Sequence, residues 1–216
     1  NQLWRQVSPG QWMDATDSAA AAGGDRDTVD GAFFDADHDG DLDLFLVNVD
    51  GDNELLNNNL DGSFRALAGE QGLTGAGAAG RQVLPLDLDG DRDLDIIVLN
   101  ADAPHEIYLN DRLWHYRDTG GQAAFRNSPA LAGLALDLDN DGVIDVVTVD
   151  DSGRVLGWSV DDTGALSPRV LWQGEPATGW AQLAASDLDG DGVQDLLLAN
   201  AHGWWVLRVN VDGTLE

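Results

Sequence analysis

The chain has no cysteine and no lysine among its 216 residues, and its apolar runs are short. Without cysteine there is no disulfide framework, no thiolate metal site and no cysteine nucleophile. No apolar run approaches the roughly 18–20 residues that a membrane-spanning helix needs, so we expect no membrane insertion. The sequence opens Asn-Gln-Leu-Trp, without the charged segment and apolar run of a targeting peptide.

Positive charge is scarce. Eleven arginines face 39 acidic residues, which gives a formal net charge of −28 at pH 7. Nucleic acid and anionic membrane surfaces would repel such a chain, so we expect neither as a partner. The hydrophobic fraction of 43% is nevertheless that of a folded domain and excludes wholesale disorder.

An internal repeat of about fifty residues organises the chain. Four acidic segments align without gaps, and their starts are 52, 50 and 50 residues apart: residues 35–43, 87–95, 137–145 and 187–195. Each acidic segment follows a short apolar run and leads into another that ends in Asn or Asp. Short runs rich in Val, Ile, Leu and Phe, bounded by Asp, Asn and Gly, are typical of β-strands.

The repeat predicts an all-β fold, a β-propeller of four-stranded antiparallel blades in a single domain over residues 1–216. The acidic segment joins the first two strands of each blade, and a hairpin joins the last two. The expected units are a half blade at 1–28, blades at 29–80, 81–127 and 128–178, and an incomplete blade at 179–216. About four to four and a half blades form either a small closed ring or an arc of a larger propeller, with further blades from the same or another chain.

The acidic segments predict metal sites. Four carboxylates at positions 1, 3, 5 and 9 of one loop would repel each other strongly without a cation. Ca²⁺ fits because it takes 6–8 oxygen ligands in flexible geometry, whereas Mg²⁺ demands a tighter octahedron. The candidate side-chain ligands are Asp35, Asp37, Asp39 and Asp43; Asp87, Asp89, Asp91 and Asp95; Asp137, Asp139, Asp141 and Asp145; and Asp187, Asp189, Asp191 and Asp195.

Three further positions bear on these loops. Position 6 is glycine in three loops, which permits a positive φ, but Arg92 stands there in the second loop. We therefore expect three or four Ca²⁺ ions, with the second site the weakest. At position 7 we expect the side chains of Asp41 and Asp93 to point to solvent and their backbone carbonyls to be ligands. His38, at position 4 of the first loop, is expected to be solvated.

The loops begin like an EF-hand, Asp-x-Asp-x-Asp-Gly, but they are not EF-hands. An EF-hand needs a bidentate Glu at position 12 and flanking helices. Position 12 here lies inside a predicted strand and is occupied by Leu46, Val98, Thr148 and Leu198. The Asp at position 9 is therefore expected to close the site.

These loops, each followed by an apolar strand that ends in Asn, resemble FG-GAP/VCBS repeats, the calcium-bearing blades of integrin α-subunits and of many secreted bacterial proteins. The stretch from Phe33 to Leu73 is similar to cartilage-acidic-protein-like chains; it contains Asn58-Asn59-Leu60-Asp61-Gly62-Ser63-Phe64 and Gly69-Glu70-Gln71-Gly72-Leu73. The resemblance implies a propeller with calcium between the first and second strands of each blade. It also implies backbone carbonyl ligands at position 7, that is at Asp41, Asp93, Val143 and Val193.

No catalytic constellation stands out. The four histidines share no spacing, and no nucleophile elbow or phosphate-binding glycine loop is present in the sequence. We therefore expect that the protein is not an enzyme. We expect a calcium-stabilised module for protein–protein interaction, adhesion or structural scaffolding. The alternatives are a carbohydrate-binding propeller and an accessory segment of a polysaccharide-active enzyme.

The eight tryptophans bear on these alternatives. Trp4, Trp158 and Trp204 fall on predicted third strands, and Trp12, Trp114 and Trp172 on predicted fourth strands. Most are expected to pack between blades, but some could line a sugar-binding pocket. Trp204 and Trp205 are the candidates, because neighbouring strand residues face opposite ways and one of them is expected to face outward.

A partner, protein first or glycan second, is expected on the face opposite the calcium loops. That face carries the loops between second and third strands, at residues 50–53, 101–104, 151–153 and 201–203. Extracellular modules bind calcium at around 10⁻⁴–10⁻³ M, and resting cytosol would leave such sites empty. We therefore expect an extracellular, cell-surface or periplasmic location.

Overall fold

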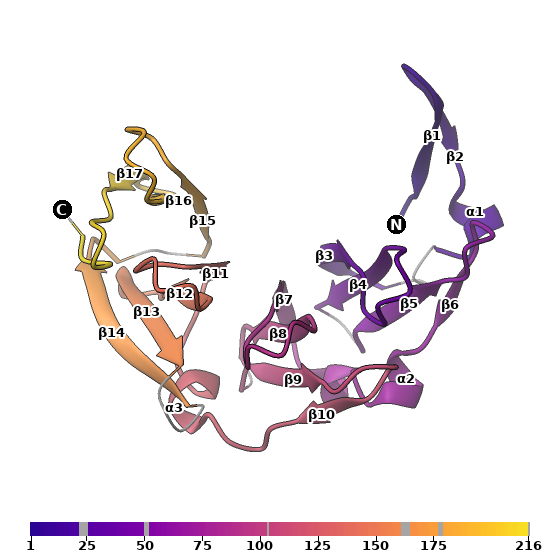
Figure 1. Ribbon diagram of the computed structural model, residues 1–216, viewed down its shortest axis with the longest axis horizontal. Coiled ribbons are helices and arrows are strands. Elements are labelled where there is room, and N and C mark those ends of the chain that lie inside the picture. The colour runs from indigo at the N-terminus through magenta and orange to yellow at the C-terminus, as the bar shows by residue number, and fades with distance from the viewer. Residues whose placement is uncertain (22–25, 50–51, 103, 161–164, 177–178, 216) are drawn as a thin grey trace.

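The computed structural model describes residues 1–21, 26–49, 52–102, 104–160, 165–176 and 179–215 (Figure 1). Residues 50, 51 and 103, which belong to loops expected to face a partner, lie outside this description. Five antiparallel sheets follow one another along the chain. None of the short helices in the described ranges has the length or the apolar composition that a membrane crossing requires.

The sheets form a hairpin and four blades. The hairpin pairs β1 (Trp4–Ser8) with β2 (Gln11–Asp14). Blade 1 contains β3 (Thr28–Phe34), β4 (Asp43–Asn48), β5 (Glu54–Asn58) and β6 (Phe64–Ala66). Blade 2 contains β7 (Gly80–Leu86), β8 (Asp95–Asn100), β9 (Glu106–Asn110) and β10 (Tyr116–Asp118). Blade 3 contains β11 (Ala132–Leu136), β12 (Asp145–Val149), β13 (Arg154–Val160) and β14 (Leu166–Gln173). Blade 4 contains β15 (Ala181–Ser186), β16 (Asp195–Asn200) and β17 (Gly203–Leu207).

Short helices lie between these sheets. They are α1 (Thr16–Ala19) after the hairpin, α2 (Ala68–Gln71) and the 3₁₀ helix η1 (Gly75–Gly77) after blade 1, and α3 (Ala123–Arg126) after blade 2. The all-β propeller of antiparallel blades is thereby confirmed. Three of the four blades have four strands, and blade 4 has three within the described ranges.

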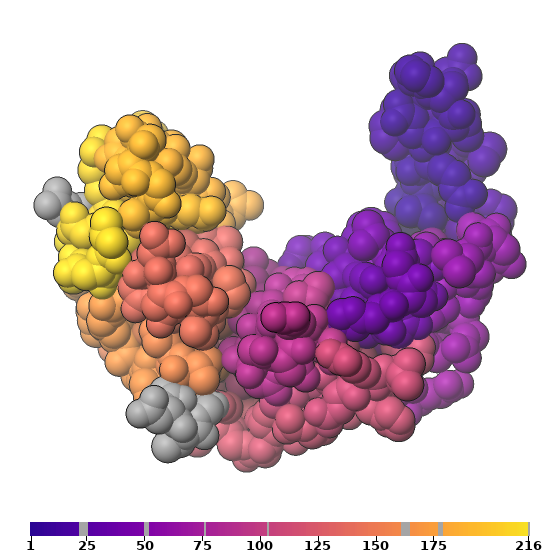
Figure 2. Space-filling view, viewed as in Figure 1, coloured from indigo at the N-terminus to yellow at the C-terminus, as the bar shows by residue number. Residues whose placement is uncertain are grey.

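The blades form an open arc. Figure 2 shows a wide gap between the N-terminal hairpin and the C-terminal blade, so the two ends of the chain do not meet. Hairpin β1–β2 pairs with no other sheet in the described part of the chain. Of the two arrangements expected from the sequence, the structure has the arc and not the closed ring.

The first strands of the blades line the inner edge of the arc. Strand β7 packs against β3 on one side and β11 on the other, and β11 packs against β15. Side chains fasten these strands to each other. Asp30 accepts a hydrogen bond from the Val83 amide at 2.9 Å. Gln82 binds both backbone groups of Gly133, accepting from its amide at 2.8 Å and donating to its carbonyl at 3.0 Å.

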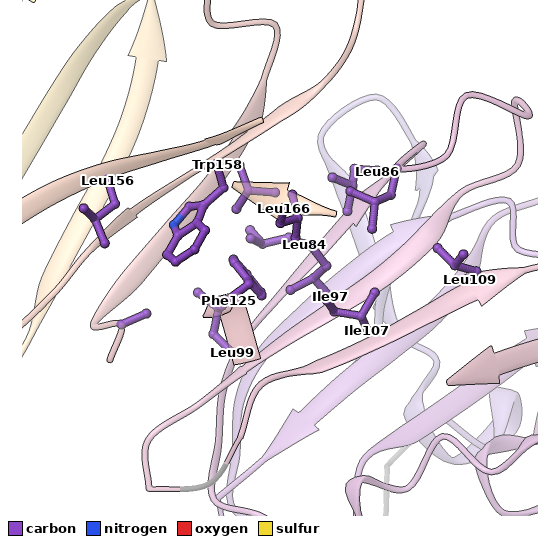
Figure 3. Packing of buried hydrophobic residues seen from close by; sticks show 13 residues of the cluster. Leu84, Leu86, Ile97, Leu99, Ile107, Leu109, Phe125, Leu156, Trp158 and Leu166 are labelled. Carbon is purple, nitrogen blue, oxygen red and sulfur yellow. The ribbon is translucent and has the colours of Figure 1, made fainter. Parts of the chain in front are cut away.

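The hydrophobic core is divided into layers between successive blades. Along each second strand, alternate residues face opposite neighbours, as the two-residue period of a strand requires. In blade 2, Ile96 packs toward blade 1 and Ile97 toward blade 3. Between blades 2 and 3 the rings of Phe125 and Trp158 form a T-shaped pair, with centroids 5.1 Å apart (Figure 3).

The predicted position of Trp114 on a fourth strand is wrong. Strand β10 begins only at Tyr116, and the three residues Arg112, Leu113 and Trp114 all have positive φ. Their left-handed backbone forms a wide turn after β9, although none of them is a residue that favours this region. The Trp114 ring still packs against the core between blades 1 and 2.

Candidate metal centres

All four acidic loops lie between the first and second strands of their blades and share two internal hydrogen bonds. The carboxylate at position 1 accepts a bond from the amide at position 6 in every loop. These pairs are Asp35 with Gly40 (3.2 Å), Asp87 with Arg92 (3.1 Å), Asp137 with Gly142 (3.0 Å) and Asp187 with Gly192 (3.1 Å). The shared bond curls each loop around its first carboxylate.

The carboxylate at position 5 closes the second half of the loop. It accepts from the amide at position 7 in every blade. These pairs are Asp39 with Asp41 (3.1 Å), Asp91 with Asp93 (3.0 Å), Asp141 with Val143 (2.8 Å) and Asp191 with Val193 (2.8 Å). Two carboxylates per loop are thus fixed by the loop's own backbone.

The curl needs left-handed backbone at two positions. Position 6 has φ of +93° at Gly40, +74° at Arg92, +87° at Gly142 and +91° at Gly192. Position 4 is also left-handed, with φ of +65° at His38, +78° at Gly90, +61° at Asn140 and +80° at Gly190. Arg92 therefore adopts the conformation expected of a glycine. The requirement at position 4 was missed, although Gly or Asn in three of the loops signals it.

The loops gather their carboxylates into four clusters. Within each cluster, one oxygen from each of three aspartates lies within 4.8 Å of the others. The clusters are Asp35, Asp37 and Asp39; Asp87, Asp89 and Asp95; Asp137, Asp139 and Asp141; and Asp187, Asp189 and Asp191. Loops 1, 3 and 4 bring together positions 1, 3 and 5, whereas loop 2 brings together positions 1, 3 and 9.

Several carboxylate oxygens in these loops are covered but have no hydrogen-bond partner among the residues that the structure describes. They include Oδ1 of Asp35, Oδ1 of Asp139 and both oxygens of Asp41. Burial raises the pKa of Asp37 and Asp41, and neighbouring carboxylates raise both pKa values further. An unpartnered covered carboxylate is costly unless a cation compensates it. An all-oxygen set of this kind fits Ca²⁺.

The expectation that the Asp41 side chain points to solvent is therefore wrong. Both of its oxygens are covered, and the carboxylates of Asp39, Asp37 and Asp35 act on its pKa.

The aspartates at position 9 are buried at the base of each loop. In blade 2, Asp95 accepts from the amides of Leu88 (2.7 Å) and Asn110 (2.8 Å), and so ties the loop to the third strand. Asp43 and Asp195 make the equivalent pairs of bonds, and Asp145 accepts from the Leu138 amide. Burial raises the pKa of Asp43 to about 6 and that of Asp95 to about 7. An ionised carboxylate has about four acceptor sites, so these bonds leave capacity for a metal.

Asp93, at position 7 of loop 2, is also not solvated as expected. It is completely buried, and its two oxygens meet Arg112 Nε and His38 Nε2, each at 2.7 Å. His38 belongs to loop 1, so its side chain links the loops of neighbouring blades instead of lying free in solvent. The backbone of Asp93 remains a candidate ligand.

Arginines also approach two of the clusters, which the repeat pattern did not reveal. Arg117 lies 3.7 Å from Asp89 in loop 2, and Arg208 lies 2.6 Å from Asp189 in loop 4. Loops 1 and 3 have no such ion pair to a candidate ligand in the described ranges. Both arginines follow the third strand of their blade, so the sequence of the acidic loop alone does not predict these ion pairs.

A cavity of about 660 Å³ opens at the inner edge of the arc, on the face opposite the acidic loops. Its lining residues lie where the first strands begin and the second strands end, and they come from all four blades. Trp180, which is half exposed, forms part of its wall together with Arg81, whose Nε is covered and has no hydrogen-bond partner in the described ranges. Trp180 precedes β15 and was not among the expected sugar-binding residues.

Trp204 and Trp205 face opposite ways, as expected. Trp204 is exposed at the start of β17. Trp205 packs into the core between blades 3 and 4, where its ring lies 6.0 Å from that of Trp172. Trp205 is therefore a packing residue.

The sequence pattern described as FG-GAP-like repeat matches residues 35–98 and 137–198, together more than half of the chain. Cartilage acidic protein 1 of Xenopus tropicalis is 30% identical over 173 residues, and the human protein of the same name is 27% identical over 184 residues. Each match covers 73% of this chain but only 26% of the relative, so the chain spans about a quarter of those proteins.

Among solved structures, an Agrocybe aegerita lectin is similar in fold. The TM-score is 0.57 at 20% identity, over 85% of this chain and 49% of the lectin. That structure is described for specific recognition of non-reducing terminal N-acetylglucosamine. The likeness concerns the propeller fold alone.

Proposed function

Because this chain belongs to the family of FG-GAP-like repeats, we propose that it is a non-catalytic, calcium-binding β-propeller module that binds a protein partner. One observation carries the metal part of the proposal. Four loops that share two internal hydrogen bonds each gather three carboxylates within 4.8 Å. In the proposal, positions 1, 3, 5 and 9 supply side-chain ligands and position 7 supplies a carbonyl.

Calcium would then contribute to folding. A ligand that binds only the folded state stabilises it by roughly 2.7 kcal/mol per site at 100 times Kd. Three sites would match much of the roughly 5–15 kcal/mol that stabilises an ordinary domain. A thermal melt with and without EDTA tests this: we expect a large fall of Tm in EDTA, and an unchanged Tm contradicts the calcium role.

The location follows from the metal. Sites of the modest affinity typical of extracellular modules fill only where calcium is abundant. We therefore propose a secreted, cell-surface or periplasmic protein. Recovery of the native protein solely from cytosol would count against this location.

The cavity opposite the loops supports a partner site on that face. It combines an exposed aromatic ring at Trp180 with a positive group at Arg81 in a strongly acidic chain. A display library of secreted domains can be panned against the calcium-loaded protein. A partner of this site loses affinity for Trp180→Ala and Arg81→Ala and keeps it for Trp12→Ala, which lies on the distant hairpin. An equal loss of affinity in all three variants would show that the partner binds outside this cavity.

Glycan binding is the second candidate, and Trp180 and Trp204 favour it because exposed aromatic faces suit the apolar faces of sugars. A glycan array probed with the wild type and with the Trp180→Ala and Trp204→Ala variants separates the candidates. Glycan signals that are seen with the wild type and lost in both variants favour a glycan partner. An array on which the wild type gives no signal favours the protein partner.

A further inference from the structure

Side chains connect acidic loops 1 and 2 across the boundary between blades 1 and 2. His38, at position 4 of loop 1, lies 2.7 Å from the buried carboxylate of Asp93, at position 7 of loop 2. His38 stands in the sequence between Asp37 and Asp39, two of the three aspartates that loop 1 gathers. Its side chain therefore links the carboxylate cluster of one blade to the residue whose carbonyl is a candidate ligand in the next.

Asn110, at the end of β9, makes a second connection. Its Nδ2 donates to the carbonyl of Ala36, at position 2 of loop 1, at 2.9 Å. Its own amide donates to Asp95, the position 9 aspartate of loop 2, at 2.8 Å, and its Oδ1 accepts from the Arg112 amide at 3.0 Å. One buried residue therefore bonds both to the backbone of loop 1 and to a candidate ligand of loop 2.

Tyr116, at the start of β10, is a third polar residue at this boundary. Its hydroxyl is covered and has no hydrogen-bond partner within the described ranges. Burial raises the pKa of Tyr116, and the carboxylates of Asp43 in loop 1 and Asp95 in loop 2 raise it further. The charges of both position 9 aspartates thus act on the same buried hydroxyl, which belongs to the surroundings of both loops.

The boundary between blades 2 and 3 is built differently. The repeat identifies the corresponding residues, since Val160 pairs with Leu166 in blade 3 as Asn110 pairs with Tyr116 in blade 2. None of the four counterparts of His38, Asp93, Asn110 and Tyr116 has a polar side chain: they are Gly90, Val143, Val160 and Leu166. Gly90, Val143 and Val160 line a cavity of about 530 Å³. An open space therefore lies between loops 2 and 3 where side chains connect loops 1 and 2.

From these contacts we infer that loops 1 and 2 bind calcium as a coupled pair, in which binding at either loop strengthens binding at the other. The inference rests on the proposed calcium function and adds a regulation of the sites to it. Loops 2 and 3, whose boundary has apolar residues or glycine at these positions, are expected to bind independently. The coupling is therefore a property of one boundary in the chain and not of the repeat.

Coupling follows from the conformational freedom that each loop loses on binding. Binding at loop 1 holds His38 between its two ligand neighbours, and with it the Asp93 carboxylate that it meets. It also holds the Ala36 carbonyl, and so Asn110, which bonds to Asp95. Loop 2 then has less freedom left to lose, and a site that is already ordered binds its ligand more tightly.

Each loop contains a glycine amide that reports on its own site. These amides donate to the position 1 carboxylates of loops 1 to 4, and they belong to Gly40, Gly90, Gly142 and Gly192. Their NMR signals, followed in one calcium titration at a single pH, give a midpoint for every loop. Asp37→Asn weakens loop 1, and Asp139→Asn is the matched change at position 3 of loop 3.

We expect Asp37→Asn to raise the calcium midpoint of the Gly90 signal by about 5-fold or more, the lower end of typical coupling between sites. The Gly142 midpoint is expected to stay the same, because loop 3 lies two blades away. In Asp139→Asn the Gly90 midpoint is also expected to stay the same. A Gly90 midpoint that does not move in Asp37→Asn, or that moves equally in Asp139→Asn, overturns the inference.

Coupling between two sites is reciprocal. Asp89→Asn, at position 3 of loop 2, is therefore expected to raise the midpoint of the Gly40 signal by the same factor. A Gly90 midpoint that moves in Asp37→Asn while the Gly40 midpoint stays unchanged in Asp89→Asn would indicate local damage to loop 2 and would overturn the inference.

Residues taken from blade 3 show whether the observed contacts are responsible for the coupling. The triple variant His38→Asn, Asn110→Val, Tyr116→Leu gives this boundary the residues that blade 3 has at the same positions. In this background we expect Asp37→Asn to change the Gly90 midpoint by less than about 2-fold. His38→Asn alone keeps the buried residues and is expected to reduce the coupling. Full coupling in the triple variant, or in His38→Asn where the triple variant does not fold, overturns the inference.

The glycine signals also distinguish this inference from the proposed function. If calcium moves the signal of no loop, both are contradicted. If calcium moves the signals of all four loops but the midpoints of loops 1 and 2 are independent, the calcium function stands and only the coupling is overturned.

Discussion

His38 Nε2 lies 2.7 Å from Oδ1 of Asp93, across the boundary between blades 1 and 2. Arg112 reaches the other oxygen of Asp93 from the turn after β9. The carboxylate is completely buried, whereas both of its basic partners are largely exposed. This contact joins two acidic loops, so the candidate metal sites of blades 1 and 2 share a common support.

The burial of Asp93 predicts an asymmetry between variants. Removing the carboxylate leaves two basic side chains that water can solvate, but removing both basic partners leaves a buried, uncompensated charge. We expect the double variant His38→Ala, Arg112→Ala to be less stable than Asp93→Asn. Urea unfolding midpoints measured in calcium and in EDTA give the order. A lower midpoint for Asp93→Asn under both conditions would contradict this arrangement.

Arg92 has a backbone that suits glycine, with φ of +74°. A non-glycine residue in this region costs about 1–2 kcal/mol. Arg92→Gly is therefore expected to raise stability by about 1 kcal/mol and to tighten the second calcium site. Arg92→Ala is the control, because it removes the charge but keeps the strain. If alanine and glycine act equally, charge and not backbone conformation governs this loop.

A substitution of Asp139 distinguishes a role in metal binding from a role in holding the loop conformation. Its covered Oδ1 has no hydrogen-bond partner in the described chain, so the carboxylate contributes like-charge repulsion unless a cation is bound. Asp139→Asn is expected to lower the Tm in calcium, through loss of up to roughly 2.7 kcal/mol from one site, and to leave it unchanged or higher in EDTA. Asp52→Asn, at an exposed aspartate outside the loops, is the matched control. A decrease of equal size in both conditions would show that Asp139 acts on the loop alone.

His105 predicts a pH dependence away from the loops. Burial lowers the pKa of His105 to about 4, and the charge of Arg81 acts in the same direction. The unfolded chain takes up this proton near pH 6.5 and the folded chain near pH 4, so stability falls as pH drops through this range.

A neighbouring blade supplies a substitution that tests this dependence. His105 Nδ1 accepts the Asn100 amide at 3.1 Å, and Asn53 accepts the Asn48 amide at 3.1 Å in blade 1. His105→Asn is therefore expected to keep the bond and to lose less stability between pH 7 and pH 4. Parallel stability profiles for wild type and variant would contradict the assignment to His105.

Repetition made most of the fold predictable. Four copies of one loop at nearly constant spacing indicated the blades and the glycine-like backbone at Arg92. The alternation of side chains along a strand indicated that one of Trp204 and Trp205 faces outward, but not which one. The contact of Asp93 with His38 could not be derived in this way, because it depends on how neighbouring blades pack. The turn at Trp114 was missed for a related reason. Its three left-handed residues have no propensity for that region, so the surrounding structure must hold them there.

Titration of the metal-free protein with calcium, followed by calorimetry, tests the central claim most directly. Clusters in all four loops predict three or four bound ions per chain. The weakest is expected in the loop from Asp87 to Asp95, where Arg92 is strained and Arg117 approaches Asp89. Three or four ions, with the weakest lost first in Asp87→Asn, is the predicted result. A protein that binds no calcium would contradict the account and leave the acidic loops as polar turns.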